Sequence, residues 1–179
     1  MNKKFELLFD DTIEVFGRKL FRIKAKINFG EVEVGDLGGY IEKEENLSEN
    51  GNAWVCGNAR VCGNALVCGN AMVCGNAMVY GNALVCCNAE VSGNAEVYGN
   101  AEVYGNARVT SQKDYIVFKN SWSSFRWFTY TKSNKMWKVG CFYGTGQELI
   151  EKAYQDSEKS GKCYEAYVNL VLELEKLDD

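Results

Sequence analysis

The sequence predicts a mainly β protein in which a solenoid of stacked coils joins a β segment at one end to a small α+β domain at the other. Three observations predict this class. A six-residue unit, Gly-Asn-Ala-x-Val-x, recurs ten times between Gly51 and Thr110. Runs of β-prone residues precede the repeat, and a segment with two helical patterns follows it. We therefore divide the 179 residues into an amino-terminal β segment and cap (1–50), the repeat (51–110) and a carboxy-terminal domain (111–179).

The amino-terminal segment contains short β-prone runs within residues 5–29, separated around Asp10 and Gly17. This alternation of β-prone runs and turn-forming residues predicts a small β-meander. The lead-in segment GDLGGYIEKEENLS, residues 35–48, then connects the meander to the first repeat.

Each repeat unit has the properties of a short strand followed by a corner. Strand side chains alternate between two faces, so Ala and Val, two positions apart, share one side. The Gly-Asn pair tolerates positive φ and can turn the chain; only Cys87 replaces the glycine. One unit cannot bury its own valine, so units must stack about 4.8 Å apart. We expect Ala and Val inside, and ladders of stacked amides from Asn52 to Asn106 along the corners.

Read from Val55, the pattern Val-x-Gly-Asn-Ala-x resembles the hexapeptide rule of left-handed β-helix proteins. That resemblance implies a left-handed parallel β-helix, with three hexapeptides per coil and residues 18 apart stacked. Ten units then form about three coils. Over residues 20–110, the lead-in segment and the repeat together resemble hexapeptide-repeat proteins of bacteria, phages and prophages. Proteins of this type often carry the name acetyltransferase or no assigned function.

The carboxy-terminal domain shows both strand and helix signals. Residues 115–120 and 126–142 are typical of strands. Thr145 and Glu148 form a capping box that predicts the start of a helix. Apolar residues at helical spacing between positions 164 and 174 predict a second helix. We expect this domain to cap the open end of the solenoid, whose last coil would otherwise expose unpaired backbone.

Composition limits the class of protein. The net charge of -4 excludes a strongly cationic nucleic-acid binder. The sequence lacks the pattern of a signal peptide and any apolar run long enough to span a bilayer, so we expect a cytoplasmic protein with no membrane association. Six of the eight cysteines lie in the repeat, mostly where tyrosine, serine or threonine stands in other copies. We expect them to be reduced, replaceable fillers.

The sequence favours a protein that is not an enzyme. Well-known members of the left-handed β-helix family are acyltransferases with a histidine general base and carbonic anhydrases with histidine zinc ligands. This chain has no histidine, and loss of a general base lowers a rate by a factor of about 10² to 10⁴. The stacked pairs Cys56/Cys74 and Cys68/Cys86 form linear ladders, whereas zinc needs four converging ligands. We therefore expect no catalytic residues, no metal site and no cofactor.

The outward residue before each repeat valine is mostly apolar in the first half of the solenoid and mostly charged in the second. The apolar belt consists of Trp54, Leu66, Met72, Met78 and Leu84. Outward apolar residues in this number are expected to be covered. Two alternatives stay open: the belt is covered by residues 1–40 or by the carboxy-terminal domain, or it is the interface of a homo-oligomer, a dimer or a trimer.

A basic-aromatic segment, residues 121–138, is the first candidate binding site. Its candidate residues are Arg126, Trp127, Tyr130, Lys132 and Lys135. Aromatic rings can stack on bases while cations neutralise phosphates, which would suit a nucleotide or a nucleic acid. The alternative is that alternate aromatic residues form the core of a small sheet, with the basic residues on its solvated face.

Acidic residues are the second candidate. Glu90, Glu96 and Glu102 project from the later coils, and residues 31–49 hold seven acids against the single base Lys43. A stiff rod with fixed negative charges can occupy a basic nucleic-acid channel. The alternative is a merely solvated acidic surface.

These observations together favour a non-enzymatic binding protein with a rigid β-helix scaffold. Its expected partner is a host protein or a protein–nucleic acid complex. The phage resemblance implies an inhibitor of a host defence system, such as a CRISPR effector, that acts in the host cytoplasm. The alternatives are a nucleotide or nucleic-acid binding protein, and a structural scaffold or degenerate acyltransferase.

Overall fold

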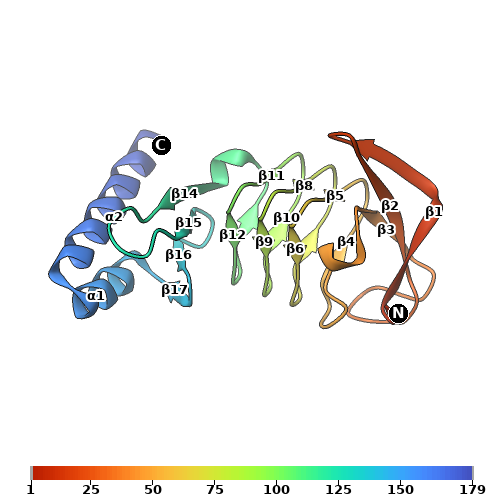
Figure 1. Cartoon of the computed structure of the whole chain (residues 1–179), viewed down its shortest axis with the longest axis horizontal. Helices are drawn as coiled ribbons and strands as arrows, with labels where there is room; N and C mark the ends of the chain where they lie inside the picture. Colours follow the sequence, from red (N-terminus) through yellow and green to blue (C-terminus); the bar gives the residue numbers. More distant parts are fainter. Residues whose placement is uncertain (1, 179) are drawn as a thin grey trace.

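The computed structural model describes residues 2–178. A parallel β-solenoid forms the middle of the molecule, between an amino-terminal β-hairpin and a carboxy-terminal sheet with two helices (Figure 1). Each hexapeptide contributes one two-residue strand. The strands are β4 (Trp54–Val55), β5 (Arg60–Val61), β6 (Leu66–Val67), β7 (Met72–Val73), β8 (Met78–Val79), β9 (Leu84–Val85), β10 (Glu90–Val91), β11 (Glu96–Val97), β12 (Glu102–Val103) and β13 (Arg108–Val109).

Residues 18 apart pair in parallel, as the repeat predicts. β4, β7, β10 and β13 form one sheet, β6, β9 and β12 a second, and β5, β8 and β11 part of a third. Every repeat Ala and Val side chain is at most 1% exposed, so the predicted interior is confirmed. Outside, amide groups 18 apart hydrogen-bond, as between Asn64 and Asn82 and between Asn82 and Asn100. The predicted asparagine ladders are therefore confirmed too.

The corners require a left-handed backbone, which explains the repeated glycine. The nine repeat glycines have φ between 63° and 73°, values that L side chains rarely adopt. Cys87, the single departure from the repeat, keeps the same conformation with φ of 64°. The stacking of neighbouring coils therefore sets the path of the chain. It keeps Cys87 in a conformation that residues other than glycine disfavour.

The solenoid begins before the first hexapeptide. Strand β3 (Leu37–Ile41), in the lead-in segment, pairs in parallel with β5, and Leu47 bridges to Val67. Gly39 permits this contact, because a Cβ atom there would lie 2.5 Å from the carbonyl oxygen of Ala59. Each interior column now has four members: Ile41, Val61, Val79 and Val97; Leu47, Val67, Val85 and Val103; Val55, Val73, Val91 and Val109. The lead-in segment thus extends the roughly three coils of the hexapeptides to four.

The predicted β-meander is present at the amino-terminal end. Strand β1 (Phe5–Val15) pairs antiparallel with β2 (Arg18–Ala25), which pairs antiparallel with β3. The chain turns at Phe16 and Gly17, both with positive φ. Asp10 does not mark a turn, because it lies in a bulge of β1 between Leu8 and Thr12. The meander continues the β5–β8–β11 sheet into one sheet of six strands.

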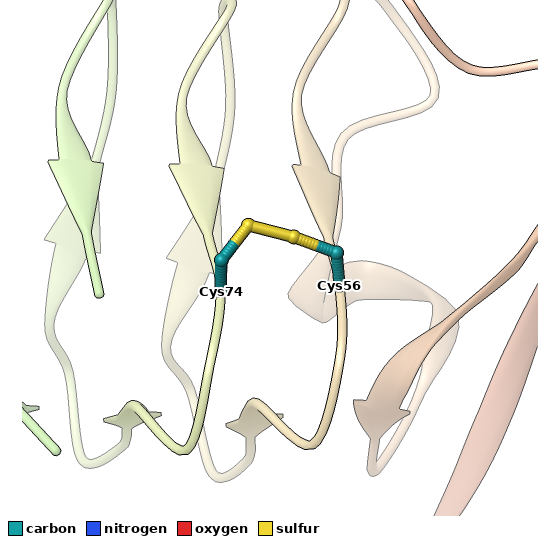
Figure 2. The surroundings of a disulfide bond; sticks show 2 residues. All are labelled: Cys56 and Cys74. Atoms are coloured by element: carbon teal, nitrogen blue, oxygen red, sulfur yellow. A yellow bond between two sulfur atoms is a disulfide. The ribbon is translucent and has the colours of Figure 1, made fainter. Parts of the chain in front are cut away.

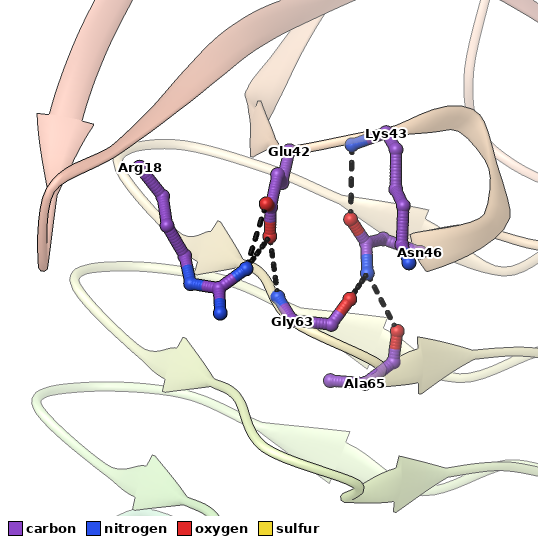
Figure 3. A network of polar contacts seen from close by, with 6 residues as sticks. All are labelled: Arg18, Glu42, Lys43, Asn46, Gly63 and Ala65. Carbon is purple, nitrogen blue, oxygen red and sulfur yellow. Dashed lines mark hydrogen bonds and ion pairs between the residues drawn. The ribbon is translucent and has the colours of Figure 1, made fainter.

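Polar side chains supply hydrogen-bond donors at the start of the solenoid, where the backbone of a regular coil does not. Asn46, in the short 3-10 helix η1 (Glu44–Asn46), is fully buried. Its amide donates to the carbonyl oxygens of Gly63 (3.1 Å) and Ala65 (2.8 Å), and its oxygen accepts from the Lys43 N–H (Figure 3). Both carbonyls belong to the second coil and point toward the first, so the Asn46 side chain replaces backbone donors that the lead-in segment does not supply.

Lys4 closes another part of this end. Its side chain is 1% exposed and donates from Nζ to the carbonyl oxygens of Ala53 (2.6 Å) and Ser48 (3.1 Å). Burial lowers the pKa of the Lys4 ammonium to about 8. An ammonium buried in this way is less stable than in water, even when it is hydrogen-bonded.

We expect the Lys4 ammonium to make stability depend on pH. An unfolded lysine has a pKa near about 10.4, so between about pH 8 and pH 10 the folded chain binds fewer protons than the unfolded chain. The free energy of unfolding should rise with pH across this window. Buried thiols act in the opposite direction, because burial raises the pKa of Cys62 and Cys68. Urea unfolding of the chain and of Lys4→Met at about pH 7.5 and about pH 9.5 isolates the effect. Equal pH dependence in both would contradict it.

The carboxy-terminal domain has the predicted elements. Strands β14 (Tyr115–Lys119), β15 (Trp127–Thr131), β16 (Met136–Val139) and β17 (Phe142–Gly144) form an antiparallel sheet, preceded by the 3-10 helix η2 (Gln112–Asp114). The helices α1 (Gly146–Asp156) and α2 (Glu158–Asp178) follow. The capping box is confirmed, since the Thr145 hydroxyl accepts from the Glu148 N–H and the Glu148 carboxylate from the Thr145 N–H.

This domain caps the last coil, as predicted. The Thr129 hydroxyl accepts a hydrogen bond from the backbone N–H of Glu102 at 2.9 Å. The Ser133 hydroxyl accepts a hydrogen bond from the backbone N–H of Arg108 at 2.8 Å. The Tyr115 hydroxyl donates to the carbonyl oxygen of Glu96 at 3.0 Å. Backbone groups that would pair with a further coil thus find side-chain partners.

One pair of cysteines differs from the prediction. Cys56 and Cys74 stand one above the other in neighbouring coils and are joined by a disulfide bond (Figure 2). The prediction of reduced cysteines is therefore wrong for this pair. The parallel register of β4 and β7 places their Cα atoms 4.7 Å apart, within the range of about 4.4 to 6.8 Å that a disulfide spans. The same stacking that produces the asparagine ladders brings these thiols together.

Candidate functional site

The three predicted acids of the later coils all have partners within the chain. Glu90 forms an ion pair with Arg108 at 3.3 Å, and Glu102 forms one with Lys138 at 3.6 Å. Glu96 accepts hydrogen bonds from the Tyr80 hydroxyl and the Gln112 amide. They come from three different sheets, so the structure does not bring them together. These ion pairs and hydrogen bonds within the chain offset part of the negative charge of all three carboxylates.

The basic-aromatic candidates lie on separate surfaces. Tyr130 is buried against α2, and its hydroxyl donates to the Glu175 carboxylate at 2.5 Å. Lys132 and Lys135 border a hollow beside α2. Arg126 lies beyond the other end of β15, where it donates to the Ser124 hydroxyl. Trp127, 43% exposed, borders a different hollow with Tyr98 and Tyr115.

The arrangement of these aromatic residues follows from β-strand alternation. Phe128 and Tyr130 of β15 point into the core under the helices, where they pack with Trp137. Thr129, between them, faces the solenoid, as its hydrogen bond with the Glu102 N–H shows. The alternative interpretation, that alternate aromatic residues form the core of a small sheet, accounts for this part of the segment.

The apolar belt is partly covered within the chain. Trp54 is 3% exposed and packs edge-to-face against Phe29. Met78 is also buried, in a cluster with Val15, Leu20 and Tyr40 of the amino-terminal meander. For these two residues the alternative of cover by residues 1–40 holds, and they are not available to a subunit interface. Leu66, Met72 and Leu84 remain partly exposed.

An acidic hollow lies at the amino-terminal end of the solenoid, with a volume of about 300 Å³. It is lined by Asn2, Glu44, Glu45, Leu47, Ser48, Glu49 and Leu66. Its three carboxylates are exposed, and Leu66 contributes an apolar wall. The η1 turn positions Glu44 and Glu45, because Asn46 of the same turn is anchored on the second coil.

The charge of this hollow is largely uncompensated. Glu49 accepts a hydrogen bond from the backbone N–H of Lys3. Within residues 2–178, neither Glu44 nor Glu45 has an ion-pair partner. The described residues also contain no group of acidic or cysteine side chains that could hold a metal ion. Three carboxylates around a leucine suit a lysine or arginine side chain of a partner protein, because such a side chain combines an apolar stem with a positive charge.

A neighbouring acid shows how this end is held together. Glu42 accepts hydrogen bonds from Arg18 (2.8 Å) and from the Gly63 N–H (2.6 Å) (Figure 3). Burial alone would raise the pKa of this carboxyl, but the two hydrogen bonds and the nearby positive charges hold the pKa below its usual range. Glu42 therefore stays ionised and links the β1–β2 hairpin to the second coil.

Comparison with known proteins supports the fold. The family model for the YdcK beta solenoid repeat matches residues 53–69 and 71–86. These stretches contain β4 to β9, the first six hexapeptide strands. The repeated part of the chain is thus of a β-solenoid repeat type. No curated protein matches the chain.

The sequence shows the acids of residues 31–49, but it did not predict that three of them line one hollow. The available signal was the run Glu44, Glu45 and Glu49 close before the repeat. What was missing was the path of the lead-in segment, which places these acids beside Leu66 of the second coil. Neither described helix is long and apolar enough to cross a bilayer.

Proposed function

We propose that this chain is a non-enzymatic binding protein. Its solenoid is a rigid scaffold, and its acidic hollow binds a basic side chain on the surface of a partner protein. The observation that carries the proposal is the pair of exposed carboxylates of Glu44 and Glu45 beside Leu66, for which residues 2–178 contain no ion-pair partner. Such a surface offers both charge complementarity and apolar area to a lysine or arginine side chain. The absence of histidine from the sequence supports the non-enzymatic part.

The scaffold role rests on how both ends join the rod. The β1–β2–β3 meander continues one sheet of the solenoid without a break. At the other end, Thr129 and Ser133 bond directly to the backbone of the last coil. A filled interior of Ala and Val leaves no hinge between these ends. A partner therefore meets two end structures whose separation does not change on binding.

The finer part of the proposal concerns the partner. We infer a host defence complex, such as a CRISPR effector, and a phage-encoded chain that acts in the host cytoplasm. The resemblance of residues 20–110 to phage and prophage proteins supports this part. Effectors of this kind hold nucleic acid in a positively charged channel, which a rigid acidic body can block. Self-association as a dimer or trimer belongs to the same proposal and would use the partly exposed Met72 and Leu84, which lie outside the hollow.

The hollow is tested by replacing Glu44, Glu45 and Glu49 together with lysine. Reversal of charges at the centre of an electrostatic interface is expected to weaken binding at least about tenfold. In cells that carry an active CRISPR system against a phage, the intact chain should restore phage plating, and the triple variant should not. Capture of proteins from a bacterial lysate by the immobilised chain tests binding independently of the identity of the partner.

A matched control has the same change in charge at the opposite end of the molecule. Lysine at Glu151, Glu158 and Glu173, all exposed on the two helices, should leave plating and capture unchanged. Circular dichroism melts check that both triple variants fold. Full protection and full capture by the hollow variant would overturn the proposed site. Capture without protection would remove the finer part alone.

A further inference from the structure

A second pair of cysteines occupies the same place in the repeat as the disulfide-bonded pair. The valines that precede Cys68 and Cys86 are paired in the same parallel register as those that precede Cys56 and Cys74. Cys68 and Cys86 therefore also stand one above the other, on a neighbouring sheet of the solenoid. Burial raises the pKa of the Cys68 thiol, and Cys86 raises it further, as expected for neighbouring side chains. The backbone spacing that permits one disulfide is thus repeated here.

A third thiol stands at the same corner. Cys87 is the one residue of the ten repeats that replaces a corner glycine, and it keeps the left-handed φ of 64°. Residues other than glycine adopt this conformation at an energetic cost. Cys87 raises the pKa of the Tyr104 hydroxyl and contributes to the raised pKa of the Cys68 thiol, so it lies near both side chains. Three thiols therefore lie together on a surface where the other corners have one or none.

We propose that Cys68 and Cys86 are a redox-active dithiol that closes to a second cross-coil disulfide by exchange with a low-molecular-weight disulfide. In the first step the thiolate of one of these two cysteines attacks one sulfur of the small disulfide, forms a mixed disulfide and releases one thiolate. In the second step the other cysteine loses its proton and attacks the protein sulfur of the mixed disulfide, which releases the second thiolate. Two protein thiols lose two electrons and two protons, and the small disulfide becomes two small thiols.

The corner is accessible to a small disulfide, because all three cysteines are only partly buried. Burial raises the pKa of the Cys68 thiol, and the neighbouring Cys86 raises it further. The thiolate is the attacking species, so the raised pKa slows the exchange at neutral pH without changing its products.

Closure would join successive coils. Cys56–Cys74 links the first coil to the second, and Cys68–Cys86 would link the second to the third. The third sheet has no such pair, because Tyr80 stands above Cys62. The proposed bond is therefore specific to one corner of the solenoid.

The test is oxidation of the folded chain with oxidised glutathione, followed by thiol counting and peptide mapping. The structure has six free cysteines. We expect the count to fall by two, with a linked peptide pair that contains Cys68 and Cys86. Dithiothreitol should restore both of these thiols and should also release those of Cys56 and Cys74. Cys68→Ser should form no internal bond and should lose one thiol, as a glutathione adduct at Cys86 that no second cysteine displaces. Cys62→Ser is the matched control, because Cys62 has the same place in the repeat without a cysteine above it, and it should still lose two thiols.

A second variant keeps the proposal falsifiable if Cys68→Ser folds poorly. Cys87→Gly restores the repeat residue, and it should still form the Cys68–Cys86 bond. In the unmodified chain or in Cys87→Gly, an unchanged thiol count, a lasting glutathione adduct without the internal bond, or a bond that involves Cys141 or Cys163 would each overturn the proposal.

Discussion

Reduction of the Cys56–Cys74 disulfide is expected to lower the free energy of unfolding by about 3 kcal/mol. The bond closes a loop with a sequence separation of 18 residues. In the chain-entropy account, a cross-link of this length stabilises the fold by restricting the unfolded chain. The two coils also remain paired through backbone hydrogen bonds, so we expect the reduced chain to fold. Urea unfolding with and without a phosphine reductant measures the difference.

Two variants show whether this effect belongs to the disulfide. Replacement of both Cys56 and Cys74 by serine should lower the free energy of unfolding of the untreated chain. The reductant should then lower it little further, because this disulfide is absent from the variant. Cys141→Ser, which changes an exposed free cysteine, should behave like the unmodified chain. Equal urea midpoints for the chain and the double variant under non-reducing conditions would refute the stabilising role.

Asn46→Ala is expected to lower the free energy of unfolding by about 3 kcal/mol, because it removes three hydrogen bonds from a fully buried group. The carbonyl oxygens of Gly63 and Ala65 would each lose a donor at the start of the solenoid. Asn46→Asp should also destabilise the fold, because a carboxylate oxygen would then face these two oxygens. Chemical unfolding followed by circular dichroism measures both changes.

The matched control is an asparagine whose side chain is hydrogen-bonded but exposed. Asn82 takes part in an outer ladder, where it bonds to Asn64 and Asn100. Asn82→Ala should change the free energy of unfolding by less than about 0.5 kcal/mol, because water replaces its partners. If both alanine variants lost the same stability, the closing role of Asn46 would be contradicted.

The repeated part of the fold could be predicted almost completely from the sequence. A period of six residues determines which side chains face inward, and the size of Val and Ala suits a narrow interior. The glycine of each corner also follows from local backbone preference. These features depend on neighbours within one unit and on identical units stacked above it. Local rules therefore suffice for residues 51–110.

The first coil could not be predicted in the same way. Residues 37–47 enter the solenoid without repeating its unit, and Gly39 is needed there for close approach to Ala59 rather than for a turn. Lys4 and Asn46 are polar residues with buried roles, which depend on carbonyl groups far along the chain. No pattern in the sequence near either residue shows which carbonyls lack a donor.

The candidate site was predictable only in its composition. A cluster of acids before the repeat was visible, but whether each acid is paired depends on contacts between distant segments. Glu102 meets Lys138, which lies 36 positions later in the sequence, whereas Glu44 and Glu45 have no such contact among the described residues. The basic-aromatic segment shows the same limit, because Tyr130 is directed toward Glu175 on α2.

The three interior columns have a consequence for how this protein can change in length. Each column repeats after 18 residues, so duplication or deletion of three hexapeptides would shift the carboxy-terminal domain along the axis by one spacing of about 4.8 Å. Its orientation would be preserved. Gain or loss of a single hexapeptide would instead rotate that domain by a third of a turn and move Thr129 and Ser133 to the wrong sheets. Relatives that keep this capped architecture should therefore differ in solenoid length by whole coils.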